Sequence, residues 1–339
     1  MTDSRSLSRP LIILTGDLGS GKTSGLPLLA KLLGSQRPHF IVNEVGAANK
    51  FVGAFGVPSA RLSLLPGGCI CCEKQSELGD LLAVLVEHPQ SEFDAIVLES
   101  SGLADPAAIL RFISLHPKLN HQLKVSSLVY FLDAASGRPP IPLRHQDLTS
   151  LAVADVCVLA KTDMIETIDR DAILAAVANV NATVALFEQR RETDIVLARV
   201  QGPRVDQVDT SKIVAKPDPS SPADNQTGPS ETANHAHVDV LNFDLPFGTS
   251  WLALSTWLIA LLHQQDTGIL RVKAAITNSG GWVSLNGVGH TVFPPDNAEF
   301  THEGNRPDGT LVIIGFGLSE QKISRSLRLL VSGKISPTS

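Results

Sequence analysis

Short apolar runs alternate with amphipathic segments between Leu11 and about Phe187. Each run is continuously apolar, which is typical of strands buried on both faces of a sheet. Helical patterns such as SELGDLLAVLVEH separate the runs, and the segment LADPAAILRFISLH has Asp105 as a candidate N-cap and Pro106 at the first helical position. The runs are LIILT, HFIVNE, DAIVLES, VSSLVYFLDA, DVCVLAKTD and TVALF. Strands alternating with helices predict an α/β fold with a doubly wound, mainly parallel sheet.

The pattern changes after residue 200. Residues 201–237 are rich in Pro, Ser, Asp, Asn, Gln and Thr and nearly devoid of apolar residues, which predicts a flexible linker or long surface loop. From Val238 onward, closely spaced strands accompany two helical segments, GTSWLALSTWLIALLHQQ and SEQKISRSLRLLVSG. We therefore expect an α/β domain over residues 1–200, a linker over 201–237 and a smaller α+β domain with an antiparallel sheet over 238–339.

Composition and charge exclude several classes of partner. The chain has 339 residues, of which 43% are hydrophobic and 18% charged, as in ordinary globular proteins. A net charge of −6 and the lack of a basic run argue against nucleic acid. No apolar stretch reaches the roughly 18 residues of a membrane span, and the polar N-terminus MTDSRSLSRP is unlike a secretion signal. We expect a cytoplasmic protein without a membrane partner, in which cysteines stay reduced.

The first apolar run leads into a phosphate-binding motif. Residues 16–23, GDLGSGKT, fit G-x-x-x-x-G-K-[ST] between a strand and a helical pattern, which predicts a P-loop NTPase domain. Its glycines let backbone N–H groups turn toward phosphate oxygens, Lys22 reaches the β- and γ-phosphates, and Thr23 ligates Mg²⁺. The helix that follows adds its partial positive charge. Nucleotide contacts are expected from Gly16, Gly19, Ser20, Gly21, Lys22, Thr23 and Ser24.

Two further strand ends carry candidate chemistry. Glu99 ends the run DAIVLE, where a carboxylate can hold the Mg²⁺ shell or orient the attacking water. Lys161 and Asp163 follow DVCVLA. A carboxylate at Asp163 can accept from both the N1–H and the exocyclic amine of guanine, and the stem of Lys161 can cover the base. The triplet Lys161-Thr162-Asp163 therefore favours GTP over ATP.

Four motifs in order, GDLGSGKTS, GGCICC, ESSGLADP and AKTD, resemble those of the CobW-like metallochaperone GTPases, relatives of the urease- and hydrogenase-maturation GTPases. The resemblance extends to GILRVKAAI and GVGH in the second domain and covers nearly the whole chain apart from the linker. It implies slow GTP hydrolysis coupled to a thiolate site for zinc or cobalt. It also implies that Glu44, in VNEVG, lies near Mg²⁺ or the metal loop.

The sequence departs from the family pattern in three places. Ala160 stands where the family usually has Asn, so a loop-tying hydrogen bond is missing and weaker guanine affinity is expected. The segment after Glu44, which resembles the first switch of the family, has Ala47, Ala48 and Asn49 where acidic residues are typical. This difference puts in question whether the segment responds to metal. The His-rich tract of many members is reduced to His235 and His237.

Three of the four cysteines, Cys69, Cys71 and Cys72, follow Pro66-Gly67-Gly68 in one short segment. No regular helix or strand brings all three sulfurs of C-x-C-C together, but an irregular loop can. Three thiolates suit a soft cation such as Zn²⁺, and one coordination position left open suits transfer. His290 or Glu44 are candidates for a fourth ligand. The alternatives are buried unligated thiols or a redox sensor, whereas Cys157, inside VADVCVLA, is expected in the core.

These features together predict a GTP-dependent metal chaperone that couples transfer of Zn²⁺, or a similar metal such as Co²⁺, to GTP binding and slow hydrolysis. Lys22 and Glu99 are the candidate catalytic residues, and Thr23, Glu44 and Glu99 the candidate Mg²⁺ sphere. Expected partners are a client metalloprotein or a protein of a metal-cofactor pathway, with a second copy of the chain as a further candidate. The alternatives are a nucleotide-sensing regulatory protein with little or no hydrolysis and a small-molecule kinase.

Overall fold

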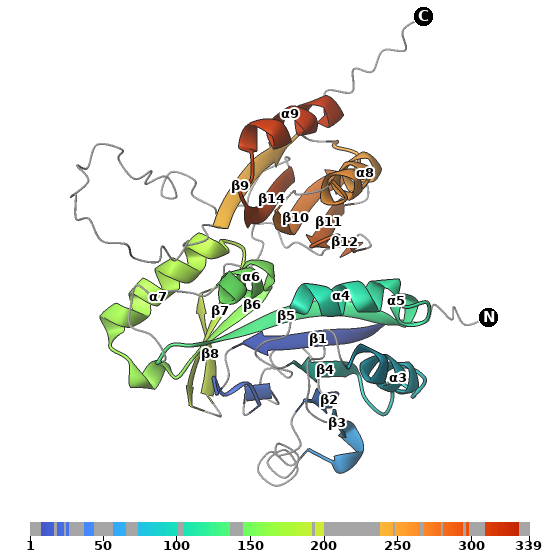
Figure 1. The fold of residues 1–339 in the computed structure, drawn as a ribbon, viewed down its shortest axis with the longest axis vertical. Helices are drawn as coiled ribbons and strands as arrows, with labels where there is room; N and C mark the ends of the chain where they lie inside the picture. Colours follow the sequence, from blue (N-terminus) through green and yellow to red (C-terminus); the bar gives the residue numbers. More distant parts are fainter. Residues whose placement is uncertain are drawn as a thin grey trace, which may run out of the picture.

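Two sheet-based domains stack on one another in the computed structural model of the chain (Figure 1). The structure describes residues 8–16, 19–23, 25–26, 37–43, 57–65, 74–100, 105–135, 145–191, 194–199, 238–246, 248–264, 268–278, 281–293, 296–297 and 309–331. The predicted linker, residues 201–237, lies outside these ranges and stays a prediction.

The N-terminal domain is built on one sheet with strand order β3-β2-β4-β1-β5-β6-β7-β8. Every pairing is parallel except that of β8, which runs antiparallel to β7 at the edge. The mainly parallel sheet predicted from the continuous apolar runs is confirmed. The strands are β1 (Arg9–Gly16), β2 (Pro38–Val42), β3 (Leu62–Leu64), β4 (Ala95–Glu99), β5 (Leu123–Asp133), β6 (Val156–Ala160), β7 (Ala185–Arg191) and β8 (Asp194–Arg199).

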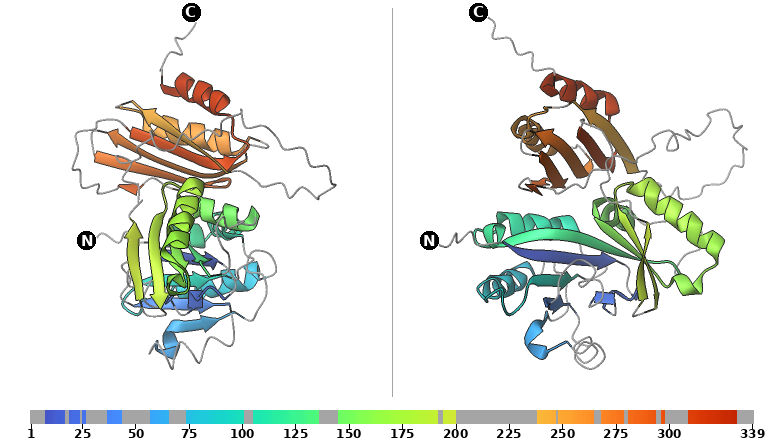
Figure 2. Two further views of the ribbon diagram at one scale, coloured as in Figure 1. Left: turned by 90° about the vertical axis from the view of Figure 1, so that its left-hand side faces the viewer. Right: turned by 180° about the vertical axis from the view of Figure 1, so that it is seen from behind.

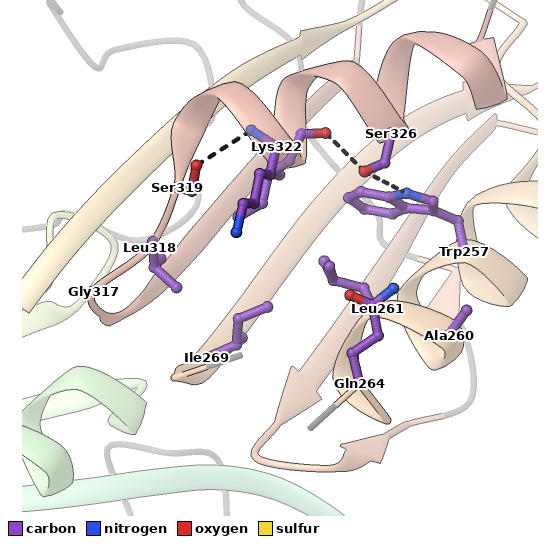
Figure 3. Close-up of a pocket in the computed structure, with 11 residues that line it drawn as sticks. Trp257, Ala260, Leu261, Gln264, Ile269, Gly317, Leu318, Ser319, Lys322 and Ser326 are labelled. Carbon is purple, nitrogen blue, oxygen red and sulfur yellow. Dashed lines mark hydrogen bonds between the residues drawn. The ribbon is translucent and has the colours of Figure 1, made fainter. Parts of the chain in front are cut away.

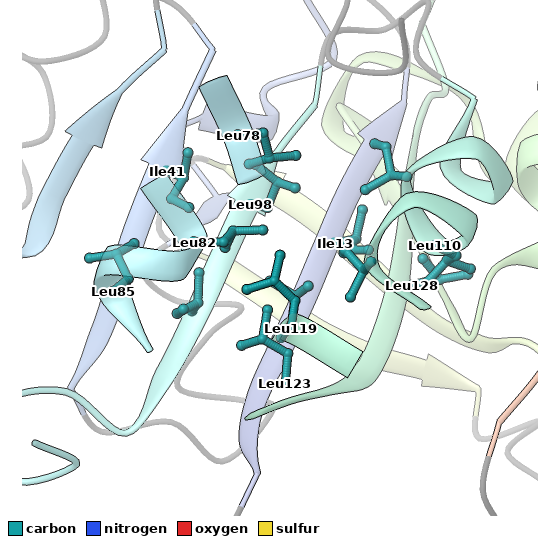
Figure 4. Packing of buried hydrophobic residues seen from close by; sticks show 14 of the residues in the cluster. Ile13, Ile41, Leu78, Leu82, Leu85, Leu98, Leu110, Leu119, Leu123 and Leu128 are labelled. Atoms are coloured by element: carbon teal, nitrogen blue, oxygen red, sulfur yellow. The ribbon is translucent and has the colours of Figure 1, made fainter. Parts of the chain in front are cut away.

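Helices cover both faces of this sheet, as the term doubly wound requires. In β1, Leu11 and Ile13 pack toward α3, α4 and α5, whereas Ile12 and Leu14 pack on the other face with Leu26, from the helix that begins at Lys22 (Figure 4 shows the first cluster). The helices are α3 (Gln75–Leu85), α4 (Pro106–Leu115), α5 (Leu119–Gln122), α6 (His145–Val153) and α7 (Thr167–Val180), with short 3₁₀ turns at Ser59–Arg61 and Thr162–Met164. This layering holds the carboxyl ends of β1, β2, β4 and β6 at one edge of the sheet.

The predicted start of α4 is confirmed. Asp105 is extended and its side chain accepts a hydrogen bond from the backbone N–H of Ala107 (2.9 Å), while Pro106 occupies the first helical position. A carboxylate N-cap satisfies a backbone donor that the helix cannot. The start of the helix that follows the loop after Glu99 is therefore fixed locally.

The C-terminal domain is the predicted small α+β unit with an antiparallel sheet. Its strands run in the order β12-β11-β10-β14-β9, and β13 also pairs with β11. Helices α8 and α9 lie on the face turned away from the N-terminal domain (Figure 2). The elements are β9 (Val238–Leu245), α8 (Trp251–Leu262), β10 (Ile269–Asn278), β11 (Gly281–Val288), β12 (Thr291–Val292), β13 (Asp296–Asn297), β14 (Gly309–Phe316) and α9 (Glu320–Val331).

Both faces of the C-terminal sheet carry buried apolar residues, and those of the second face form the contact between the domains. Leu311 and Ile313 of β14 pack with α8 and α9, whereas Val312 and Ile314 pack with apolar residues of α6 and α7. Val288 of β11 joins the core cluster that contains α4. The C-terminal domain therefore packs on α4, α6 and α7, the helices that follow the carboxyl ends of β4, β5 and β6.

An ion-pair cluster reinforces this contact. Arg271 of β10 donates to the carbonyl of Val153 (2.8 Å) and to Asp155 Oδ1 (2.5 Å), and Lys273 lies 3.1 Å from the same carboxylate. Burial alone would raise the pKa of Asp155, but the charges of Arg271 and Lys273 outweigh it and hold that pKa below its ordinary value. Asp155 immediately precedes β6, so the cluster ties the C-terminal sheet to the strand that leads to Lys161.

Arg271→Ala is expected to lower the free energy of unfolding by about 3 kcal/mol, because it removes a buried guanidinium and leaves the partly buried carboxylate of Asp155 without its main partner. Since the folded-state pKa of Asp155 lies below its unfolded value, this stabilisation is present above the unfolded pKa and is lost as the pH falls through the folded one. Urea denaturation as a function of pH measures both effects. Lys118→Ala, which removes an exposed ion pair with Glu87, is the control and should cost under about 1 kcal/mol. Equal losses in the two variants would contradict the assignment.

Candidate nucleotide and metal site

The phosphate loop begins where β1 ends. Gly19 and Gly21 have positive φ angles of 75° and 85°, a conformation that glycine adopts without strain. Lys22 is buried, and its Nζ donates to the carbonyl of Gly16 (2.9 Å). The hydroxyl of Ser20 is buried and has no hydrogen-bond partner among the described residues. A backbone turned at two glycines, a buried ammonium and an unpartnered hydroxyl fit a phosphate group, which would give the hydroxyl a partner and the ammonium a counter-charge.

Glu99 lies beside the loop, at the end of the neighbouring strand β4. The hydroxyl of Thr23 donates to Glu99 Oε1 at 2.7 Å, and Glu99 is only 6% exposed. Ser100 fixes the strand end, because both its backbone N–H and its hydroxyl donate to the carbonyl of Leu14 (2.8 Å each). A hydroxyl and a carboxylate side by side are hard oxygen ligands of the kind that Mg²⁺ prefers. These two residues therefore fit the predicted Mg²⁺ sphere.

The third predicted strand end, after β6, has a specific conformation. Lys161 has a φ of 59° and its Nζ donates to Asp133 Oδ2 (2.5 Å), which holds the side chain at the sheet edge. Thr162 is buried, while Asp163 is exposed at the start of a 3₁₀ turn. Asp163 is thus accessible to a ligand, and its role in reading a base stays a prediction.

Two residues at this edge were missed by the sequence analysis. Asp133 ends β5, is 6% exposed and pairs with Lys161; it could have been found as a carboxylate that closes an apolar run, the signal that selected Glu99. Gln189 lies near the end of β7, in register with Ala160 of β6, and is 4% exposed. No local pattern distinguishes Gln189 from the neighbouring Glu188, which is paired with Arg170 on α7.

The predicted metal ligands lie largely outside the described residues. The predicted ligands outside the described ranges are Glu44, Cys69, Cys71 and Cys72. The same holds for Ser24, a predicted nucleotide contact, and for Ala47, Ala48, Asn49, His235 and His237. Within the described ranges, no group of three or more His, Cys, Asp or Glu side chains could hold a metal ion. His290 is exposed in the turn after β11, with its Nδ1 2.5 Å from the carbonyl of Leu262. Cys157 is fully buried in β6, so its placement in the core is confirmed.

A separate groove of about 320 Å³ lies between α8 and α9 of the C-terminal domain (Figure 3). Trp257 and Leu261 line it from α8, and Lys322 lines it from α9. The indole N–H of Trp257 donates to the Ser326 hydroxyl (3.2 Å), which joins the two helices. None of the predicted nucleotide or metal residues is among those that line this groove, so it is not part of the candidate site.

The described part of the chain contains no helix that is both long enough and apolar enough to cross a membrane. Two family models match the sequence. The model described as "CobW/HypB/UreG, nucleotide-binding domain" matches residues 10–188, and that described as "Cobalamin synthesis protein cobW C-terminal domain" matches residues 240–331. The two matches correspond to the two domains of the fold.

Individual relatives agree with these matches. The protein named zinc chaperone YjiA, from Escherichia coli (strain K12), is 25% identical over 319 residues, which cover 92% of this chain and 95% of that protein. The zinc-regulated GTPase metalloprotein activator 1 of Saccharomyces cerevisiae is 30% identical over 129 residues, 37% of this chain and 30% of that protein. The crystal structure of Zn(II)-bound YjiA GTPase from E. coli shares the fold, with a TM-score of 0.59 at 19% identity over 95% of this chain and 99% of that one. Since the first model matches more than half of the sequence, the chain belongs to the CobW/HypB/UreG family.

Proposed function

We propose that this protein is a GTP-dependent zinc chaperone, which binds GTP with Mg²⁺ at the phosphate loop and carries Zn²⁺ on Cys69, Cys71 and Cys72. The observation that carries the nucleotide part is the hydrogen bond of 2.7 Å between Thr23 and Glu99, directly beside the buried Lys22. The zinc part is supported by the cysteine spacing and by the relatives named as zinc chaperones. Co²⁺ is a further candidate cargo.

The proposed chemistry assigns one task to each side chain. Lys22 places a fixed positive charge where the β- and γ-phosphates would lie, so it stabilises charge that develops during phosphoryl transfer. Thr23 and Glu99 hold Mg²⁺, which would neutralise phosphate charge when bound. Asp163 accepts hydrogen bonds from guanine. Because the transferred group is only positioned and neutralised, slow hydrolysis is the expected rate class in the absence of a further activating group.

The topology supports coupling between nucleotide and metal. Glu44 follows directly on Asn43 after β2, and residues 66–73, which carry the cysteines, separate Leu65 after β3 from α3. The backbone N–H of Leu65 donates to the carbonyl of Val42 (2.9 Å), so both segments begin at the same edge as the phosphate loop. A nucleotide that orders the first segment would therefore act next to the start of the second. The metal would be released to a client metalloprotein when hydrolysis relaxes both.

The coupling is tested by the affinity for Zn²⁺ with and without a non-hydrolysable GTP analogue. We expect a change of about tenfold, which is typical of energetic coupling between two sites. Competition with a chromophoric zinc chelator measures it. In the Lys22→Ala variant the analogue should have no effect at matched concentration. Identical zinc affinities with and without the analogue in the parent protein would remove coupling from the proposal.

A regulatory nucleotide sensor is the second candidate function. Ala160, buried at the end of β6, contributes only a methyl group to the base-reading segment, residues 160–163. This favours weaker or slower use of GTP. This candidate predicts GTP binding without turnover by the pure protein. Release of inorganic phosphate above the no-protein rate decides against it.

A further inference from the structure

Gln189 is an amide buried in apolar surroundings next to the phosphate loop. It lies on the face of the sheet where Ala160, Phe131 and Phe187 form a hydrophobic cluster, opposite the face on which Glu188 pairs with Arg170. Its side chain is 4% exposed, and its Oε1 has no hydrogen-bond partner among the described residues. A buried acceptor left unpaired is costly, and this one stands at the edge that carries the candidate nucleotide site.

The amide lies close to the phosphate loop and to the first turn of the helix that begins at Lys22. A Cβ added to Gly25 would lie 3.2 Å from Nε2 of Gln189, and one added to Gly21 would lie 3.6 Å from its Oε1. Glycine at position 25 is what lets the amide and the ring of Phe131 approach this turn so closely. Gln189 therefore lies between the phosphate loop and the end of β6, two segments that are far apart in the sequence.

The residue beside it in the sheet lacks a polar side chain. Ala160 is the register partner of Gln189, is 1% exposed and directly precedes Lys161. A hydrogen bond between the base-reading segment and the phosphate loop cannot come from a methyl group. The amide of Gln189, with two donors and one acceptor, has the chemistry to make it from the adjacent strand.

We infer that Gln189 is a nucleotide-positioning residue, which ties the phosphate loop to the base-reading segment after β6 and whose buried acceptor gains its partner when GTP binds. The inference rests on the proposed function, because it requires that the loop binds GTP. It adds a residue from β7 that no motif contains. It also explains how the site works with alanine at position 160.

Gln189→Leu separates this role from a purely structural one. The substitution replaces an unpaired buried acceptor by an apolar group of similar size. The thermal midpoint without nucleotide should therefore stay equal or rise. The affinity for a fluorescent GTP analogue should fall by about tenfold, since a bonded partner is lost only in the complex. We also expect KM for GTP to rise while kcat changes by less than about twofold, as for loss of uniform binding. A structural residue would instead lower the thermal midpoint and leave GTP affinity nearly unchanged.

Gln122→Leu is the matched control. Gln122 also has a buried Oε1 with no partner among the described residues, but it ends α5, at the opposite edge of the sheet. Its GTP affinity should equal that of the parent protein. If Gln189→Leu does not fold, Gln189→Met, which keeps the length of the side chain, takes its place.

Rescue completes the test. Adding Ala160→Asn to Gln189→Leu restores an amide at the base-reading edge and should recover at least about threefold of the lost affinity, as expected when one neutral hydrogen bond is regained. A parent protein that binds GTP while Gln189→Leu binds it equally well overturns this inference alone. A parent protein that binds no GTP overturns both the inference and the proposed function.

Discussion

Lys22→Ala is expected to lower GTP turnover by about two to three orders of magnitude, the usual loss when one fixed donor to a developing negative charge is removed. Lys22 is 7% exposed and its Nζ donates to the carbonyl of Gly16, so its position is set by the loop rather than by solvent. An ammonium held in this way needs no reorganisation when the phosphoryl charge develops. Phosphate release at saturating GTP measures the effect, and the thermal midpoint without nucleotide shows whether the variant folds.

Lys124→Ala is the matched control for this loss. Lys124 is exposed near the start of β5, at the amino edge of the sheet, and its removal should leave turnover within about twofold, as for ordinary surface substitutions. Unchanged turnover in Lys22→Ala would overturn the assignment of the phosphate loop. Binding of GTP by the parent protein without any turnover would instead favour the nucleotide sensor.

The fold could be predicted from the sequence wherever burial on both faces leaves a continuous apolar run. This rule found β1, β2, β4, β5, β6 and β7. It missed β3, because LSL is only three residues long and half-buried. It also missed β8, which pairs antiparallel with β7 at the sheet edge, although its sequence DIVLAR contains four consecutive apolar residues. A run of four apolar residues without a helix on each side of it does not by itself distinguish a strand from a piece of a buried helix.

The candidate site divides in the same way. Glu99 and Lys161 were found because each stands where an apolar run ends, and the structure places Glu99 against Thr23 and Lys161 against Asp133. The position of Gln189 depends on its register with Ala160 and on its approach to the phosphate loop. These are relations between distant segments, which a single sequence does not display. Residues that end an apolar run can therefore be predicted from the sequence. The pairing of strands that brings such residues together cannot.

Replacing Cys69, Cys71 and Cys72 together by serine is expected to weaken Zn²⁺ binding by about a thousandfold or more, because thiolates supply most of the free energy of such sites. A serine hydroxyl keeps the size of the side chain but stays protonated near neutral pH, so it is a poor zinc ligand. Two measurements test the change: metal analysis of protein purified without chelator, and competition with a chromophoric zinc chelator. Equal metal content in the variant and the parent would sink the assignment of the cysteine segment.

Cys157→Ala provides the matched control, since Cys157 is fully buried in β6 among core residues. It should lower the free energy of unfolding by about 1 kcal/mol, the usual cost of a core substitution, and leave zinc content unchanged.

The pH dependence of the zinc affinity distinguishes cysteine ligands from histidine ligands. Thiols bind zinc only after losing a proton, so a cysteine site weakens progressively as the pH falls below about 8.5, whereas a site of histidines keeps its affinity down to about 6.5. Affinity that is constant between these two values would therefore point to histidine ligands rather than to the cysteines.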